Sequence, residues 1–136
     1  MATVAANYAE ISKRLAAAAA RSGRSPESVV LVAVSKFHSA ERIREAAACG
    51  LKVFAESRQQ EAQAKLPLLK ALGEWHFIGP LQSNKARSVA ELFDVVQSVD
   101  SRRLADKLSQ AAGQLHKTLR IYAQVNISRE AQKQGA

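Results

Sequence analysis

The feature that most constrains the fold of this sequence is a strict alternation of short apolar runs with longer amphipathic segments. Five runs are rich in aliphatic and aromatic residues, and each is separated from the next by a segment whose apolar residues recur at helical spacing. The runs cover residues 29–34, 51–54, 75–78, 93–96 and 119–127. Short apolar runs of this kind predict buried strands. Strands that alternate with helices predict a parallel sheet with right-handed crossovers, which is an α/β fold.

The segments between the runs carry helix start and stop signals. Ser39 and Ser101 each precede a helical pattern and are expected to be N-caps, and Gly50 is expected to end the helix that Ser39 begins. Pro67 lies inside another helical segment, which it is expected to bend or break. The predicted helices cover residues 3–21, 40–49, 59–72, 84–92 and 101–116.

The alternation leaves two architectures open, a doubly wound open sheet and a (β/α) barrel. No GxGxxG or Walker loop follows the first apolar run, which argues against a nucleotide-binding version of the open sheet. The chain has 136 residues, of which 47% are hydrophobic. This is enough for one domain with its own core, and we expect a single domain over residues 1–136.

Composition excludes several classes of function. The formal charge is +8, but Lys and Arg are scattered among Asp and Glu, and aromatic residues make up only 5%. Single-strand binders interleave aromatic and basic residues, so we expect no specific nucleic-acid partner.

No apolar stretch reaches the roughly 20 residues that cross a bilayer, and no secretory signal precedes the first helix. We therefore expect a cytoplasmic protein without membrane contact. The single cysteine, Cys49, excludes an intrachain disulfide, and no His/Cys cluster predicts a metal site.

One residue stands where parallel sheets place their chemistry. Lys36 follows the first apolar run by two residues, in the sequence VAVSK. The carboxyl ends of parallel strands form the sites of such folds, and a partly desolvated lysine amine is a nucleophile towards aldehydes. The plainer interpretation is a solvated lysine. A second segment, HFIGPLQSNK, also spans a strand end. There His76 is more typical of a satisfied core residue, and Asn84 suits a helix cap as well as a ligand contact.

Three motifs in this order resemble those of the pyridoxal-phosphate homeostasis proteins, the YggS/PROSC family. They are LVAVSK ending at Lys36, WHFIGPLQSNK at residues 75–85 and QVNISREAQKQG at residues 124–135. The resemblance implies a (β/α) barrel of the alanine racemase N-terminal domain type. It also implies that pyridoxal 5′-phosphate is held as a Schiff base on Lys36, and that the protein serves intracellular homeostasis of the cofactor without being an enzyme.

The sequence departs from the family pattern after the second predicted strand. The family usually reads FGEN there, whereas this chain reads FAES. Ala55 replaces a glycine, and Ser57 replaces an asparagine that the resemblance places near the cofactor. A serine can still form hydrogen bonds, but it is shorter and lacks the amide. The resemblance therefore implies Lys36 and Ser57 as the cofactor-binding residues of this chain.

The larger departure is length, because a barrel of this type has eight strands in about 250 residues and this sequence predicts five. We expect a partial barrel, an N-terminal fragment without the loops that hold the cofactor phosphate, and hence weak affinity. The first and fifth strands should be unpaired edges beside an apolar inner face, which favours self-association. Two alternatives stay open: the barrel portion of an alanine-racemase-like enzyme, and a non-functional truncated product.

Overall fold

The strands lie in the sheet in the order in which they occur in the sequence. The structure, a computed structural model, describes residues 2–136. It contains one sheet of five parallel strands in the order β1-β2-β3-β4-β5. Their bounds are β1 Ala33–Val34, β2 Val53–Glu56, β3 Glu74–Phe77, β4 Val95–Val99 and β5 Arg120–Ala123. Right-handed crossovers that always advance in one direction place every crossover helix on the same face. This order is that of a (β/α) barrel and excludes the doubly wound sheet.

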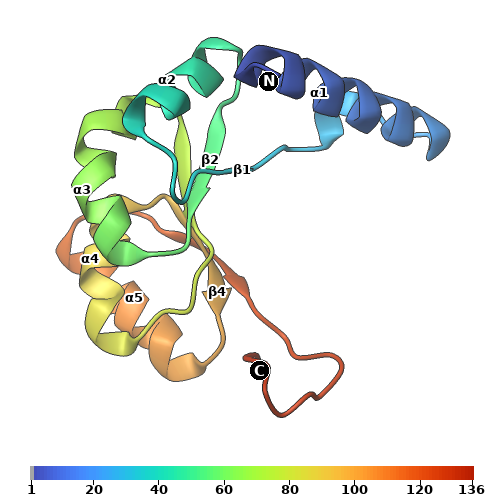
Figure 1. Ribbon diagram of the computed structural model, residues 1–136. Helices are drawn as coiled ribbons and strands as arrows, with labels where there is room; N and C mark the ends of the chain where they lie inside the picture. Colours follow the sequence, from blue (N-terminus) through green and yellow to red (C-terminus); the bar gives the residue numbers. More distant parts are fainter. Residues whose placement is uncertain (1) are drawn as a thin grey trace.

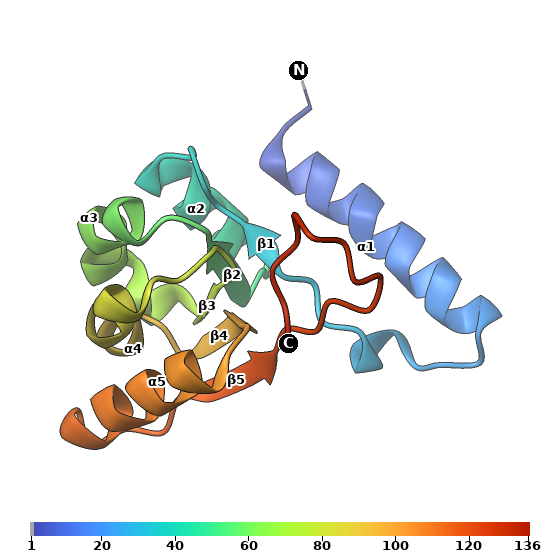
Figure 2. The same cartoon turned by 90° about the horizontal axis from the view of Figure 1, so that it is seen from below.

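The helices form one layer against the sheet. Their bounds are α1 Val4–Arg21, α2 Ala40–Ala48, α3 Gln59–Leu69, α4 Ala86–Leu92 and α5 Arg102–Gln114. Helices α2 to α5 cover one face of the sheet, and α1 lies beyond α2 at the β1 end of the layer (Figures 1 and 2). In the part of the chain that the structure describes, no helix is long and apolar enough to cross a membrane.

The local signals in the sequence produce the expected helix ends. The Ser39 hydroxyl accepts a hydrogen bond from the Arg42 amide at 3.4 Å, and the Ser101 hydroxyl accepts one from the Leu104 amide at 3.2 Å. Gly50 follows α2 with a φ of +107°, a conformation that favours glycine. Pro67 lies in α3, which ends at Leu69 and continues as a 3-10 helix over Lys70–Leu72, as a proline near the end of a helix should cause.

The hydrophobic core lies between the sheet and the helix layer. Register pairs Phe54 with Trp75, and their rings stack with centroids 5.1 Å apart. Phe77 meets Phe93 edge to face at 5.2 Å. All four rings are at most 1% exposed. Leucines from the helices, among them Leu66, complete the cluster, so a few large aromatic residues fix the spacing of the two layers.

The two edge strands are shorter than the sequence predicted. The prediction of a strand over 29–34 that is buried on both faces is wrong, because only Ala33–Val34 pair with β2 and Val34 is 45% exposed. The fifth strand stops at Ala123 instead of residue 127, and all of its residues are exposed. Each of these strands has a neighbour on one side only. No second neighbour therefore pairs with its remaining residues or covers its side chains. Their position as the two edges is confirmed.

Candidate functional site at the carboxyl ends of the strands

The segments that follow β1, β2 and β3 lie at one edge of the sheet, because the strands are parallel. Lys36 follows β1, Ser57 follows β2 and Gly79 comes two residues after β3. The segments after β2 and β3 touch: a Cβ atom on Gly79 would lie 2.0 Å from the Ser57 carbonyl oxygen. The Ser98 hydroxyl of β4 donates to the Gly79 carbonyl at 2.6 Å. These contacts join the ends of β2, β3 and β4 at a position where only glycine fits.

Lys36 lies in a tight turn between β1 and α2. The His38 amide donates to the Ser35 carbonyl at 3.1 Å, which closes the turn, and Phe37 adopts a φ of +65°. The side chain of Lys36 is exposed. Of the two interpretations of Lys36, the solvated lysine therefore agrees with the structure, and the partly desolvated amine does not. The reason is that β1 is an edge strand, so no neighbouring strand end covers the turn from its open side.

The residues next to the two predicted site residues contact each other. The Arg58 guanidinium, one residue after Ser57, lies 4.7 Å from the centre of the Phe37 ring, one residue after Lys36. A cation over an aromatic face at this distance is an attractive contact. Ser57 itself is half-buried. The structure thus brings the Lys36 turn and the Ser57 segment together through their neighbours.

A buried ion cluster lies beneath the Lys36 turn. The Lys65 amine of α3 is 2.7 Å from the Glu56 carboxylate and 2.7 Å from that of Glu61. The side chain of Glu56 is fully buried, and the oxygen that faces Lys65 also accepts a 2.7 Å hydrogen bond from the Ser35 hydroxyl. Glu61 accepts a 2.7 Å hydrogen bond from the Phe37 amide. A buried charge needs such partners, and these partners come from both sides of the Lys36 turn.

The contacts within the cluster stabilise the charged forms of Lys65 and Glu61. Burial alone would lower the pKa of Lys65, but its hydrogen bonds with Glu56 and Glu61 outweigh this effect and raise the pKa above the usual lysine value. The hydrogen bond from Lys65 lowers the pKa of Glu61 despite its partial burial, and the Phe37 amide contributes in the same direction. The ammonium group and the Glu61 carboxylate therefore both stay ionised at neutral pH.

The other face of the sheet is polar at its centre, which corrects a prediction. Register places Val34, Ala55, His76, Val95 and Arg120 in one row across all five strands. The expectation of an apolar inner face is wrong in part: Val34, Ala55 and Val95 are apolar, but this face also carries a hydrogen-bonded network of charged and amide side chains. Its members are Arg120, Glu74, His76 and Gln97. In the sequence, these polar residues alternate with apolar residues whose side chains face the helices.

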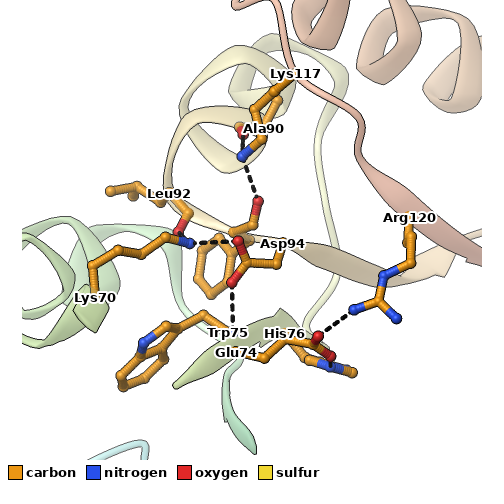
Figure 3. A network of polar contacts seen from close by, with 10 residues as sticks. Lys70, Glu74, Trp75, His76, Ala90, Leu92, Asp94, Lys117 and Arg120 are labelled. Atoms are coloured by element: carbon orange, nitrogen blue, oxygen red, sulfur yellow. Dashed lines mark hydrogen bonds and ion pairs between the residues drawn. The ribbon is translucent and has the colours of Figure 1, made fainter. Parts of the chain in front are cut away.

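The hydrogen bonds of this polar network determine which ring nitrogen of His76 carries the proton. The Gln97 amide nitrogen donates to Nδ1 at 2.8 Å, so Nδ1 accepts and Nε2 carries the proton. Nε2 then donates to Glu74 at 2.6 Å. This hydrogen bond, helped by one from Arg120 (Figure 3), lowers the pKa of Glu74 against the effect of burial. His76 is 5% exposed, so the interpretation as a satisfied core histidine is confirmed.

A second polar network lies at the opposite, amino-terminal edge of the sheet. The Asp94 carboxylate accepts hydrogen bonds from the Trp75 amide at 2.8 Å and from the Lys70 amine at 2.9 Å (Figure 3). The Lys117 amine donates to the carbonyls of Ala90 and Phe93, at 2.7 and 2.8 Å. Lys70 also donates to the Leu92 carbonyl at 2.9 Å. Both lysines therefore bond carbonyls at the end of α4, as cations at helix C-termini do. In barrels this edge serves stability rather than chemistry.

The ion cluster beneath the Lys36 turn was not predicted from the sequence. The spacing of Glu61 and Lys65 by four residues is a visible signal for a helical ion pair. The link to Glu56 joins a strand to the following helix, and no spacing rule indicates it.

Comparison with known proteins identifies the family. Residues 3–132 match the family described as "Alanine racemase, N-terminal domain". The chain belongs to this family. The match covers nearly the whole chain, and it agrees with the strand order and with the single layer of helices.

Individual relatives sharpen the resemblance. The chain is 46% identical over 136 residues to the pyridoxal phosphate homeostasis protein of Pseudomonas aeruginosa, with 99% of this chain and 59% of that protein covered. It is 43% identical over 136 residues to the protein of the same name from Escherichia coli K12, with 97% and 58% covered. The resemblance that the three motifs predicted is confirmed. The chain spans somewhat less than three-fifths of the length of these relatives.

Solved structures show the same fold. PipY of Synechococcus elongatus, solved with pyridoxal phosphate bound, matches with a TM-score of 0.74 at 43% identity, over 93% of this chain and 58% of PipY. A protein of Bifidobacterium adolescentis matches with a TM-score of 0.86 at 31% identity, over 97% of this chain and 58% of that one. The partial (β/α) barrel that the sequence predicted is confirmed.

Proposed function

We propose that this chain binds pyridoxal 5′-phosphate through Lys36 and takes part in homeostasis of the cofactor without catalysing a reaction. The observation that carries the proposal is the position of Lys36, an exposed primary amine at the carboxyl end of β1, in a chain similar to a structure solved with this cofactor. In the reaction, the neutral amine adds to the aldehyde carbon. A C=N bond, the Schiff base, forms as water leaves.

The groups at this edge of the sheet suit such a ligand. The Lys36 amine fits an aldehyde, and the Ser57 hydroxyl, on the next strand end, can donate or accept a hydrogen bond. The Arg58 guanidinium adds a cation that suits a phosphate. These three groups lie at adjacent strand ends and come from a turn and a segment that contact each other. We propose Lys36 and Ser57 as the cofactor-binding residues.

The absence of catalysis is part of the proposal. Racemisation of an amino acid needs a positioned base on each face of the α-carbon. Lys36 can supply one. His76, which the sequence offers as another titratable group, is buried and occupied by Glu74 and Gln97. An alanine-racemase-like enzyme is the second candidate, favoured by the family match. Turnover of alanine well above that of free cofactor would favour this enzyme over the carrier.

The binding test uses borohydride trapping. The chain is mixed with pyridoxal phosphate, the visible absorbance of the Schiff base is followed, and borohydride reduction with peptide mapping locates the label. We expect the label at Lys36 and its loss in Lys36→Ala. Lys52→Ala is the matched control, because Lys52 is also exposed but precedes β2 at the opposite edge of the sheet. Equal labelling of Lys36 and Lys52 would contradict the proposed site.

A further inference from the structure

The turn that carries Lys36 is held locally by two backbone hydrogen bonds, from the Ser35 amide to the Ala55 carbonyl at 2.9 Å and from the His38 amide to the Ser35 carbonyl at 3.1 Å. Strand β1 is two residues long and pairs with β2 through two register positions. The turn contains Phe37 in a left-handed conformation, with φ at +65°, which is unfavourable for a bulky residue unless its surroundings hold it. A short edge strand followed by a strained turn would sample many positions if nothing else fixed it.

Lys65 supplies further support from the helix layer. Its amine donates to the Ser35 carbonyl at 3.1 Å and to the His38 carbonyl at 3.2 Å, the two residues that bracket the turn. The side chain of Lys65 is only 14% exposed. Charge-assisted hydrogen bonds from a largely buried group are stronger than exposed ones. The amine therefore holds both ends of the turn at once.

The two carboxylates extend this support. Glu61 accepts from Lys65 and also from the amide of Phe37, the residue with the strained backbone. Glu56 forms an ion pair with Lys65 at 2.7 Å and accepts a hydrogen bond from the Ser35 hydroxyl at the end of β1. Every contact of this cluster with the turn is made by residues flanking Lys36, and none uses the Lys36 side chain.

We propose that Lys65 is a positioning residue for Lys36. This inference rests on the proposed function, in which Lys36 is the amine that reacts with the cofactor aldehyde. A reacting group that is held in place meets its partner in a productive geometry more often than a mobile one. With Lys65 in place, the turn presents the Lys36 amine in one orientation at the strand end. Without it, the turn moves and the reaction slows, although the sheet stays intact.

The test compares variants of the full chain under the trapping conditions described above. Lys65→Met removes the amine that bonds the Ser35 and His38 carbonyls. Glu61→Ala removes the support of Phe37 but keeps the buried pair of Lys65 with Glu56, so this variant should fold even if Lys65→Met does not. Two quantities are measured: the rate of labelling at Lys36 and the hydrogen-exchange protection of the Phe37 amide. We expect each variant to lower both by about tenfold, the effect of losing one or two charged hydrogen bonds.

Lys70→Met is the matched control. Lys70 also bonds a backbone carbonyl and a carboxylate, but at the opposite edge of the sheet. The Lys70→Met variant should lower the free energy of unfolding, while the rate of labelling at Lys36 stays within about twofold of the rate in the unsubstituted chain. If Lys65→Met and Glu61→Ala fold and label Lys36 at the unsubstituted rate, or if Lys70→Met slows labelling equally, the positioning role is wrong. If the unsubstituted chain does not label at Lys36, the proposed function itself fails.

Discussion

Replacing Gly79 with alanine should strongly destabilise the chain, because there is no room for a side chain where the segments after β2 and β3 touch. The new Cβ would lie 2.0 Å from the Ser57 carbonyl oxygen and 2.7 Å from its carbon. Non-bonded heavy atoms settle about 3.5–4.0 Å apart, so the two segments must separate by more than an ångström. The Ile78 amide bonds the Glu56 carbonyl at 3.0 Å, and Ser98 bonds the Gly79 carbonyl, so neither segment moves freely.

We expect Gly79→Ala to lower the free energy of unfolding by about 3 kcal/mol, the upper part of the range for overpacking. Urea denaturation measures it through the fluorescence of Trp75, the single tryptophan, which is fully buried. With a slope of about 2 kcal/mol per molar, the midpoint should fall by about 1.5 M urea.

Gly113→Ala is the control for this substitution. Gly113 lies near the end of α5, and a Cβ there meets nothing within 4 Å. Alanine in a helix is favoured over glycine by about 0.5–1 kcal/mol, so this variant should be more stable than the unsubstituted chain. If Gly79→Ala unfolds at the same urea concentration as the unsubstituted chain, the close contact between the two segments does not exist in solution.

Three further predictions concern charge, the core and association. Burial alone would raise the pKa of Asp94, but hydrogen bonds from the Trp75 amide and Lys70 outweigh it and lower this pKa. These hydrogen bonds therefore stabilise the fold fully above the pKa of an unfolded aspartate, about 4. The stabilisation is lost as the pH falls through the lower pKa of the folded state. Asp94→Asn should cost about 1 kcal/mol at pH 7, a difference that shrinks below about pH 4 in urea melts; a constant difference would contradict the assignment. Trp75→Phe should cost clearly less than the about 3–5 kcal/mol of Trp75→Ala, because the stack on Phe54 is kept and the buried indole N–H has no acceptor within residues 2–136 that would be lost. Circular-dichroism melts of the two variants compare these losses, and equal losses would contradict this. The unsubstituted chain should self-associate through its sheet edges, and Ile121→Lys, on the exposed edge strand β5, should reduce the association seen by light scattering; a monodisperse unsubstituted monomer would contradict this.

Most of the fold could be predicted from the sequence because local signals and long-range packing agree. The apolar runs at 51–54 and 75–78 became central strands, and the caps at Ser39 and Ser101 began their helices as expected. The larger errors lie at the edge strands, although β2 and β4 also begin two residues later than predicted. The run at 29–34 is β-branched enough for a longer strand, but strand length also depends on a neighbour to pair with, and the composition of the run does not reveal how many neighbours it has.

The candidate site could be predicted only in part. Lys36 was predicted as a site residue because a strand end is visible in the sequence, and Ser57 because the family resemblance indicates it; both stay predictions. The polar chain through His76 was missed, although Glu74 and His76 alternate with Trp75 and Phe77. This period-two alternation was the signal that one face of the strand is polar. Lys65 could not be assigned at all, since its partners are brought together only when α3 packs over the end of β1.

The sequential strand order also has a consequence for how the chain acquires its structure. Each strand pairs with the one that precedes it by a single helix, so no pairing has to wait for a distant segment. Contacts that are close in sequence close small loops, which form fast, and domains emerge from the ribosome N-terminal end first. The sheet can therefore grow one βα unit at a time during synthesis. Each new strand then adds to the edge left by the last, and Lys36 stands on the βα unit that precedes the other four strands along the chain.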